Sequence, residues 1–149
     1  KERYNKELAN GLGNLVSRVI TLIEKEGGKI EIKADLLKDK IENTWQGYFK
    51  ALDDFRFNQG AEAFLKLMKE ADVFLNQTQP WLEKDQEKKK ELLSSLWIVL
   101  ANLSFLIEPF IPETAFKIRE ALGLKKENKE IWLGKIFEIK RIPPLFPRL

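Results

Sequence analysis

The chain has 149 residues, of which 44% are hydrophobic and 33% are charged, and its formal net charge at pH 7 is +3. This composition excludes an intrinsically disordered chain and is typical of one folded domain of ordinary size. The sequence has no cysteine and no histidine. This excludes disulfides, thiolate chemistry and zinc–thiolate sites, and it removes the commonest catalytic base and metal ligand.

The small positive charge permits a nucleic-acid partner without indicating one. No apolar run reaches transmembrane length by inspection and no signal peptide is recognised, so we expect no membrane partner and a cytoplasmic location. Because the sequence starts with Lys1 rather than Met, residues 1–149 are interpreted as a single domain taken from a longer protein.

The apolar residues of the first segment recur at the spacing of an amphipathic helix. One side of this helix carries Leu8, Leu12, Leu15, Val19, Leu22 and Ile23. The opposite side carries Asn10, Asn14, Arg18, Thr21 and Lys25. EGGK at 26–29 predicts the end of the helix, because glycine suits a left-handed cap. A short extended segment, KIEIK, follows.

Asp35 is the expected N-cap of a second helix that runs to about Asp54. Its expected inward residues are Leu36, Leu37, Ile41, Trp45, Tyr48, Phe49 and Leu52. A third helix is predicted from about Asn58 to Asn76. Its apolar stripe is Ala61, Phe64, Leu65, Met68, Ala71, Phe74 and Leu75.

The segment LLSSLWIVLANLSFLIE is apolar almost all round and predicts the central helix of the fold. Pro109 and Pro112 end this helix and start a fifth, which Gly123 closes. The apolar, proline-rich tail at 131–149 is expected to wrap across the bundle. The predicted fold is therefore all-α, a bundle of about five helices with an irregular C-terminal tail.

No enzymatic motif is visible in the sequence, which has no phosphate-binding glycine loop, no nucleophile elbow and no metal-ligand cluster. The acidic pairs, Asp53 with Asp54 and Asp39 with Glu42, are interpreted as solvated helix faces. We expect no catalytic residue, no metal site and no cofactor site in this chain, so residue chemistry alone indicates a binding or structural module.

Asn14 and Arg18 form one candidate recognition pair, because residues four apart project side by side from a helix. Asparagine offers a donor and an acceptor to a base edge, and arginine offers a planar fork to phosphate or guanine. The alternative is that both residues are merely solvated on a polar face.

Trp81 is the second candidate, at a junction where Pro80 prevents the third helix from continuing. It could be a core plug, or an exposed platform on which an unpaired base stacks. The neighbouring Lys84 and the run Lys88 to Lys90 could add diffuse attraction for phosphate, or could simply be solvated.

Four segments of the chain, in the same order, resemble the anticodon-binding domain of methionyl-tRNA synthetases. They are RYNKELANGLGNLVSRV, PWLEK, LANLSFLIEPFIPETAFKIREALG and PPLFPRL. The resemblance covers essentially the whole chain and implies a five-helix anticodon-binding bundle. The related class I synthetases for Val, Ile, Leu and Cys share this bundle, but the first and last segments favour methionine.

The resemblance implies roles for particular residues. The family's anticodon-contacting Asn and Arg match Asn14 and Arg18, and its base-stacking Trp matches Trp81. Asn10, Pro80 and Lys84 are weaker candidates beside them. Asp72 departs from the family, which commonly has Asn there, and this puts any contact by that position in doubt.

The implied partners are the CAU anticodon loop of tRNA(Met) and the catalytic domain of the same enzyme. That domain, which activates methionine with ATP and magnesium, is absent from this sequence, so the chain alone is expected to have no ligase activity. The rival hypotheses are the anticodon domain of another class I synthetase and a helical protein-interaction module. Exposure of Trp81 beside Asn14 and Arg18 would favour RNA, and burial of Trp81 among leucines would favour the module.

Overall fold

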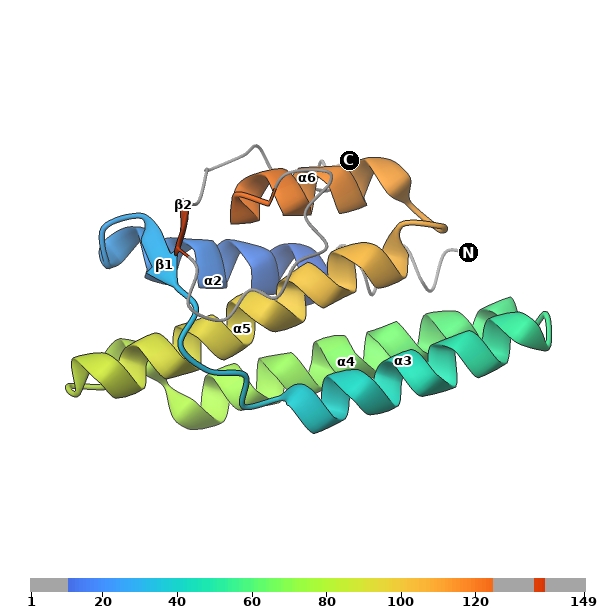
Figure 1. Ribbon diagram of the computed structural model, residues 1–149, viewed down its shortest axis with the longest axis horizontal. Helices are drawn as coiled ribbons and strands as arrows, with labels where there is room; N and C mark the ends of the chain where they lie inside the picture. The colour runs from blue at the N-terminus through green and yellow to red at the C-terminus, as the bar shows by residue number, and fades with distance from the viewer. Residues whose placement is uncertain (1–10, 125–135, 139–149) are drawn as a thin grey trace.

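The computed structural model describes residues 11–124 and 136–138, and over these residues the chain forms a bundle of five α-helices with one small sheet (Figure 1). The helices are α2 (Gly13–Lys25), α3 (Lys38–Asp53), α4 (Phe57–Thr78), α5 (Gln86–Ile107) and α6 (Pro112–Leu122). A 3-10 turn, η2 (Pro80–Leu82), separates α4 from α5, and the strands are β1 (Lys29–Glu31) and β2 (Ile136–Glu138). The all-α prediction is confirmed. Leu8, Asn10 and the PPLFPRL tail lie outside the described residues.

Helix α5 is the centre of the bundle, as its apolar sequence predicts. It packs against α2, α3, α4 and α6, and α3 and α4 lie side by side on the other face from α2 and α6 (Figure 1). Contrary to the expectation from sequence, α5 is long and apolar enough to cross a membrane by length and composition. However, 78% of its apolar window is buried inside the bundle, which is the environment of a core helix.

The helix ends follow the glycine and proline signals of the sequence. Gly28 N–H donates to Ile23 O and Gly27 N–H donates to Glu24 O, both at 3.1 Å. With φ values of 80° and 105°, these two glycines close α2 in a Schellman motif. Pro112 begins α6 and Gly123, at φ 79°, ends it.

Three expectations about α3 are wrong. The helix begins at Lys38 with Leu37 as its N-cap, so Asp35 does not cap it. Leu36 is 54% exposed because it lies in the turn before the helix, where helical spacing does not apply. Phe49 is 56% exposed and stacks on Trp45, with ring centroids 5.2 Å apart.

Two ionisable groups of this region have shifted pKa values. Burial raises the pKa of Asp35 above its usual 3.8, against the opposing effects of a hydrogen bond from the Leu37 backbone and the charge of Lys38. Burial, and then the charge of Glu108, raise the pKa of Tyr48, whose hydroxyl donates to the Leu106 carbonyl at 2.8 Å.

A two-stranded antiparallel sheet joins the end of α2 to the last described segment. Ile30 lies opposite Phe137, and Phe137 stacks on the buried Trp97 with ring centroids 4.3 Å apart. Gly123 makes room for this segment, because a Cβ there would collide with the Glu138 carbonyl. The extended segment after α2 is confirmed, whereas a strand pairing within the C-terminal tail was not predicted.

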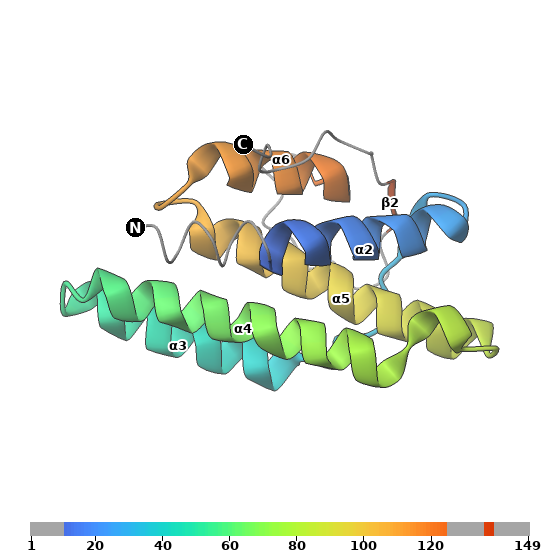
Figure 2. The same ribbon diagram turned by 180° about the vertical axis from the view of Figure 1, so that it is seen from behind.

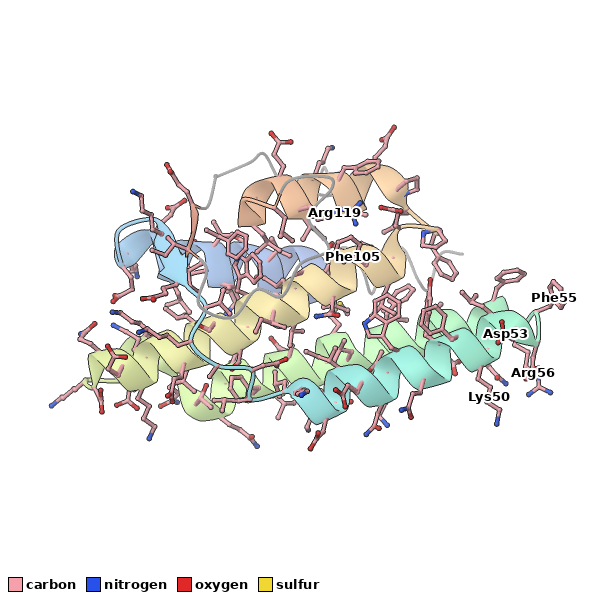
Figure 3. All side chains as sticks on the ribbon, in the orientation of Figure 1. Lys50, Asp53, Phe55, Arg56, Phe105 and Arg119 are labelled. Carbon is pink, nitrogen blue, oxygen red and sulfur yellow. The ribbon has the colours of Figure 1, made fainter. Side chains whose placement is uncertain are left out.

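A buried cation fixes α6 on α5. Arg119 pairs with Glu108, and its guanidinium lies 4.5 Å from the ring centroid of Phe105 and 5.0 Å from that of Phe116. Figure 3 shows Arg119 and Phe105 together between the two helices.

Candidate RNA-binding surface

The polar side of α2 faces solvent, as the periodicity predicts. Asn14 is exposed and Arg18, one turn later, is half-buried. The Asn14 side chain makes no hydrogen bond to any residue in the described part of the chain. Figure 2 shows α2 lying alongside α4 on this face of the bundle.

Two side chains of α4 hold the guanidinium of Arg18 in place. Its Nη1 lies 3.3 Å from Asp72 Oδ1 and its Nη2 donates to Asn76 Oδ1 at 3.0 Å. Asn76 Nδ2 also donates to Asp72 Oδ2 at 3.3 Å. Asp72 and Asn76 were not among the candidate residues, although their spacing of four on a polar helix face was visible in the sequence.

Trp81 is exposed rather than a core plug. Gln79 adopts a left-handed conformation with φ 46°, and this turns the chain out of α4. Pro80 then packs into the core, while Trp81 keeps 41% of its surface exposed. The Arg18 Cζ atom lies 5.9 Å from the centroid of the Trp81 ring, at the outer limit of a cation–π contact.

The structure therefore brings Arg18 and Trp81 together on one surface, with Asn14 one helical turn away. Three elements converge there: α2 supplies Arg18, α4 holds its guanidinium, and η2 presents the ring. This is the arrangement expected of an RNA-binding surface rather than of a tryptophan buried among leucines.

The lysines near Trp81 differ in how free they are. The Lys84 side chain is exposed and makes no ion pair with a described residue. In the run that follows, Lys88 pairs with Glu83, Lys89 with Glu26 and Lys90 with Glu87, at 3.6, 3.1 and 3.7 Å. Acidic neighbours thus offset the run, which weakens its interpretation as a free basic patch.

Over residues 11–124 and 136–138 there is no group of three or more Asp or Glu side chains that could hold a metal ion. The surface consists of hydrogen-bond donors and acceptors, a cation and an aromatic ring. Such groups can bind and stack.

The comparisons with known proteins show the family of the chain. A family model described as the anticodon-binding domain of tRNA ligase matches residues 36–138. The chain belongs to this family. The methionine–tRNA ligase of Bacillus subtilis is 31% identical to the chain, over 99% of the chain and 25% of the relative. Methionine–tRNA ligase 1 of Bacillus cereus is 30% identical, over 98% of the chain and 28% of the relative.

Solved structures support the same fold. The apo form of Mycobacterium tuberculosis methionyl-tRNA synthetase matches with a TM-score of 0.71 and 22% identity, over 99% of this chain and 33% of that one. Its form bound by methionyl-adenylate matches with a TM-score of 0.75 and 22% identity, over 98% and 32%. The chain thus spans between a quarter and a third of the length of the proteins it matches.

Proposed function

We propose that this anticodon-binding domain belongs to a methionyl-tRNA synthetase and inspects the CAU anticodon loop of tRNA(Met). The observation that carries the proposal is the pairing of a fixed guanidinium with an exposed indole, Arg18 over Trp81. The methionine–tRNA ligases among its relatives favour methionine over the other class I synthetases.

In this mechanism the loop bases leave their stack and one of them lies on Trp81. Asn14 hydrogen-bonds a base edge with its side-chain amide. Arg18 contacts a base or the neighbouring phosphate through the N–H donors that Asp72 and Asn76 leave unused. Because its guanidinium is already held, little side-chain entropy is lost on binding.

The rest of the proposed enzyme lies outside this chain. A catalytic domain of the same polypeptide would activate methionine with ATP and magnesium and esterify the tRNA in the cytoplasm. This chain alone should then show no methionine-dependent ATP–pyrophosphate exchange. Exchange above a mock-purified control would contradict the assignment of catalysis to another domain.

The deciding experiment measures binding of a CAU stem-loop and of loops changed one base at a time. We expect the CAU loop to bind most tightly, and Arg18→Ala to weaken it clearly. The ion pair of Arg18 with Asp72 is partly exposed to solvent, so its loss should lower the free energy of unfolding by about 1 kcal/mol at most. A large drop in Tm with unchanged RNA affinity would assign Arg18 a structural role, and a preference for another anticodon would favour the Val, Ile, Leu or Cys enzyme.

A further inference from the structure

A pocket of about 110 Å³ lies beside Trp81, between the end of α2 and the start of α5. Its apolar lining comes from Trp81, Pro80 and two leucines, Leu22 and Leu93. Trp81 is therefore more than an isolated platform, because an apolar recess adjoins its ring. A flat aromatic ligand placed against Trp81 on this side would also contact Pro80 and the two leucines.

The rim of this pocket is charged. Glu26, at the end of α2, and Lys89, on α5, both line it, as does Lys25. Lys89 Nζ donates to Glu26 Oε2 at 3.1 Å, and the two side chains are only 17% and 31% exposed. Lys25 makes no ion pair with any residue in the described part of the chain. The rim thus offers carboxylate acceptors directly beside ammonium donors.

An unpaired nucleobase has the complementary chemistry. Its faces are flat and stack on aromatic rings, and its edge carries hydrogen-bonding groups. Cytosine and adenine carry an exocyclic amine that donates to a carboxylate, next to a ring nitrogen or carbonyl that accepts from an ammonium. Uracil has no exocyclic amine and would place a carbonyl oxygen against the carboxylate.

We propose that Glu26 is a specificity-determining residue that selects a base with an exocyclic amine, cytosine or adenine, in the pocket beside Trp81. The base lies against the Trp81 ring, its amine donates to the Glu26 carboxylate, and Lys89 or Lys25 donates to the adjacent acceptor. This inference rests on the proposed function, because it concerns the same RNA and the same ring.

The test combines the variant Glu26→Gln with three stem-loops: the CAU loop, a loop with cytosine replaced by uracil, and a loop with adenine replaced by purine, which lacks the amine. For the unchanged chain, removing the amine that Glu26 reads should weaken binding about 10- to 100-fold. The glutamine amide is neutral and can donate as well as accept. In Glu26→Gln the ratio of the affinity for the CAU loop to the affinity for the loop without the amine should therefore fall at least about fivefold.

Two control variants separate base reading from other effects. Lys89→Gln removes the same ion pair but keeps the carboxylate, so the discrimination should remain. Glu62→Gln makes the same chemical change on the exposed face of α4, away from the pocket, and should change nothing. Melting curves of all three variants check that each is folded.

The outcomes distinguish the two proposals. If the stem-loops bind, depend on Arg18 and Trp81, and keep their affinity ratios in Glu26→Gln, the role of Glu26 is wrong and the proposed function stands. A loss of affinity by one factor for all three loops also overturns the role of Glu26. If the unchanged chain binds none of the loops, both proposals fail together.

Discussion

The two ends of α4 share an unusual construction. Each end has an exposed aromatic residue that is itself in the left-handed region or lies two residues after a residue that is, and over the described residues Phe55 and Gln79 are the only non-glycine residues with a positive φ. Phe55, at φ 58°, precedes α4 and is 80% exposed. Gln79, at φ 46°, follows α4 and leads to Trp81, which is 41% exposed.

The two ends differ in what surrounds the ring. Trp81 has a guanidinium fixed over it, a buried proline before it and a charged pocket beside it. At the other end, Phe55 projects from the tip of the α3–α4 hairpin next to Arg56 (Figure 3). The surface hollow there, of about 390 Å³, is lined only by residues 55–59.

This difference is why we propose Trp81, and not Phe55, as the ring that contacts RNA. Both ends have an exposed aromatic ring near a cation, but only at Trp81 is the cation supplied by a separate helix and held in place by side chains of α4. Arg56 makes no ion pair with another described residue. Affinity for RNA should therefore reside at the Trp81 end.

The largest effect expected is on RNA affinity when each ring is removed. Trp81→Ala should weaken binding of the CAU stem-loop by about 1–3 kcal/mol, or about five- to 150-fold, because a base loses its stacking partner. Phe55→Ala should leave affinity unchanged, and Trp81→Phe should retain most of it. Affinities can be measured by titration calorimetry on all three variants.

The same variants test the structural alternative. Trp81→Ala should lower the free energy of unfolding by less than the roughly 3–5 kcal/mol that truncating a core tryptophan costs. Early melting, with a loss of binding that tracks the unfolded fraction, would make Trp81 a packing residue. A well-folded Trp81→Ala chain with full affinity for the CAU stem-loop would show that Trp81 contributes no more to RNA binding than Phe55 does.

The second effect concerns backbone strain at the Phe55 end. Phe55 N–H donates to Leu52 O and Arg56 N–H donates to Ala51 O, at 3.0 and 2.7 Å. This is a Schellman motif with phenylalanine where glycine is preferred. Phe55→Gly should therefore raise the free energy of unfolding by about 1 kcal/mol, or about 2–4 °C in Tm, because little ring burial is lost.

RNA affinity is the companion measurement for Phe55→Gly. It should not change, since the hairpin tip lies at the other end of α4 from Trp81. A destabilised Phe55→Gly chain would mean that the exposed ring contributes to the fold in a way its exposure does not indicate.

A smaller effect on RNA affinity is expected from a substitution at Asp72, which holds the guanidinium of Arg18. Asp72→Asn keeps an oxygen that can accept from Arg18 and removes a negative charge from the RNA surface. The CAU stem-loop should bind more tightly, by up to about fivefold at low salt and less at high salt. Weaker binding would show that the carboxylate itself is needed to hold the guanidinium.

The sequence predicted the parts of this surface that depend on local pattern. Helical periodicity placed Asn14 and Arg18 on the exposed side of α2, and Pro80 marked the break that exposes Trp81. The apolar stripe of α4 and the all-round apolar α5 are also confirmed. These features follow from the repeat of one helix, which is readable in a single segment.

Helical periodicity could not predict the contacts between helices that assemble this surface. Asp72 and Asn76 are 54 and 58 residues from Arg18 in the chain, and Lys89 is 63 residues from Glu26. Which polar residues meet depends on how the helices cross, and periodicity does not specify this. Phe49 is the opposite case, since a correct helix was assigned too wide an apolar face.

The smallest expected effect is on the free energy of unfolding, from a substitution at Asp35, which lies at neither end of α4. The raised pKa of Asp35 means that the folded protein carries a penalty once the carboxyl ionises. The penalty is absent well below pH 3.8, grows as the pH rises through the folded pKa, and is complete above it. Asp35→Asn should therefore be more stable than the parent at pH 7, by a margin that shrinks toward pH 4, while RNA affinity stays the same.

Chemical denaturation at a series of pH values measures this margin. A margin that grows toward acid would contradict the raised pKa. If RNA affinity shifted with stability, the surface at Trp81 would be coupled to the global fold, and the distinction between the two ends would weaken.

The pairing of β1 with β2 has a consequence for the order of assembly. Helices α3 and α4 meet through a short turn, so their contact closes quickly, whereas Lys29 must find Glu138 more than 100 residues later. Loop-closure entropy makes such a contact slow to form. During synthesis on a ribosome, β1 emerges long before β2, and its backbone groups stay unpaired with β2 until then. We expect the end of α2 that carries Glu26 to be fixed last, so that the proposed RNA surface is complete only after β2 has been synthesised.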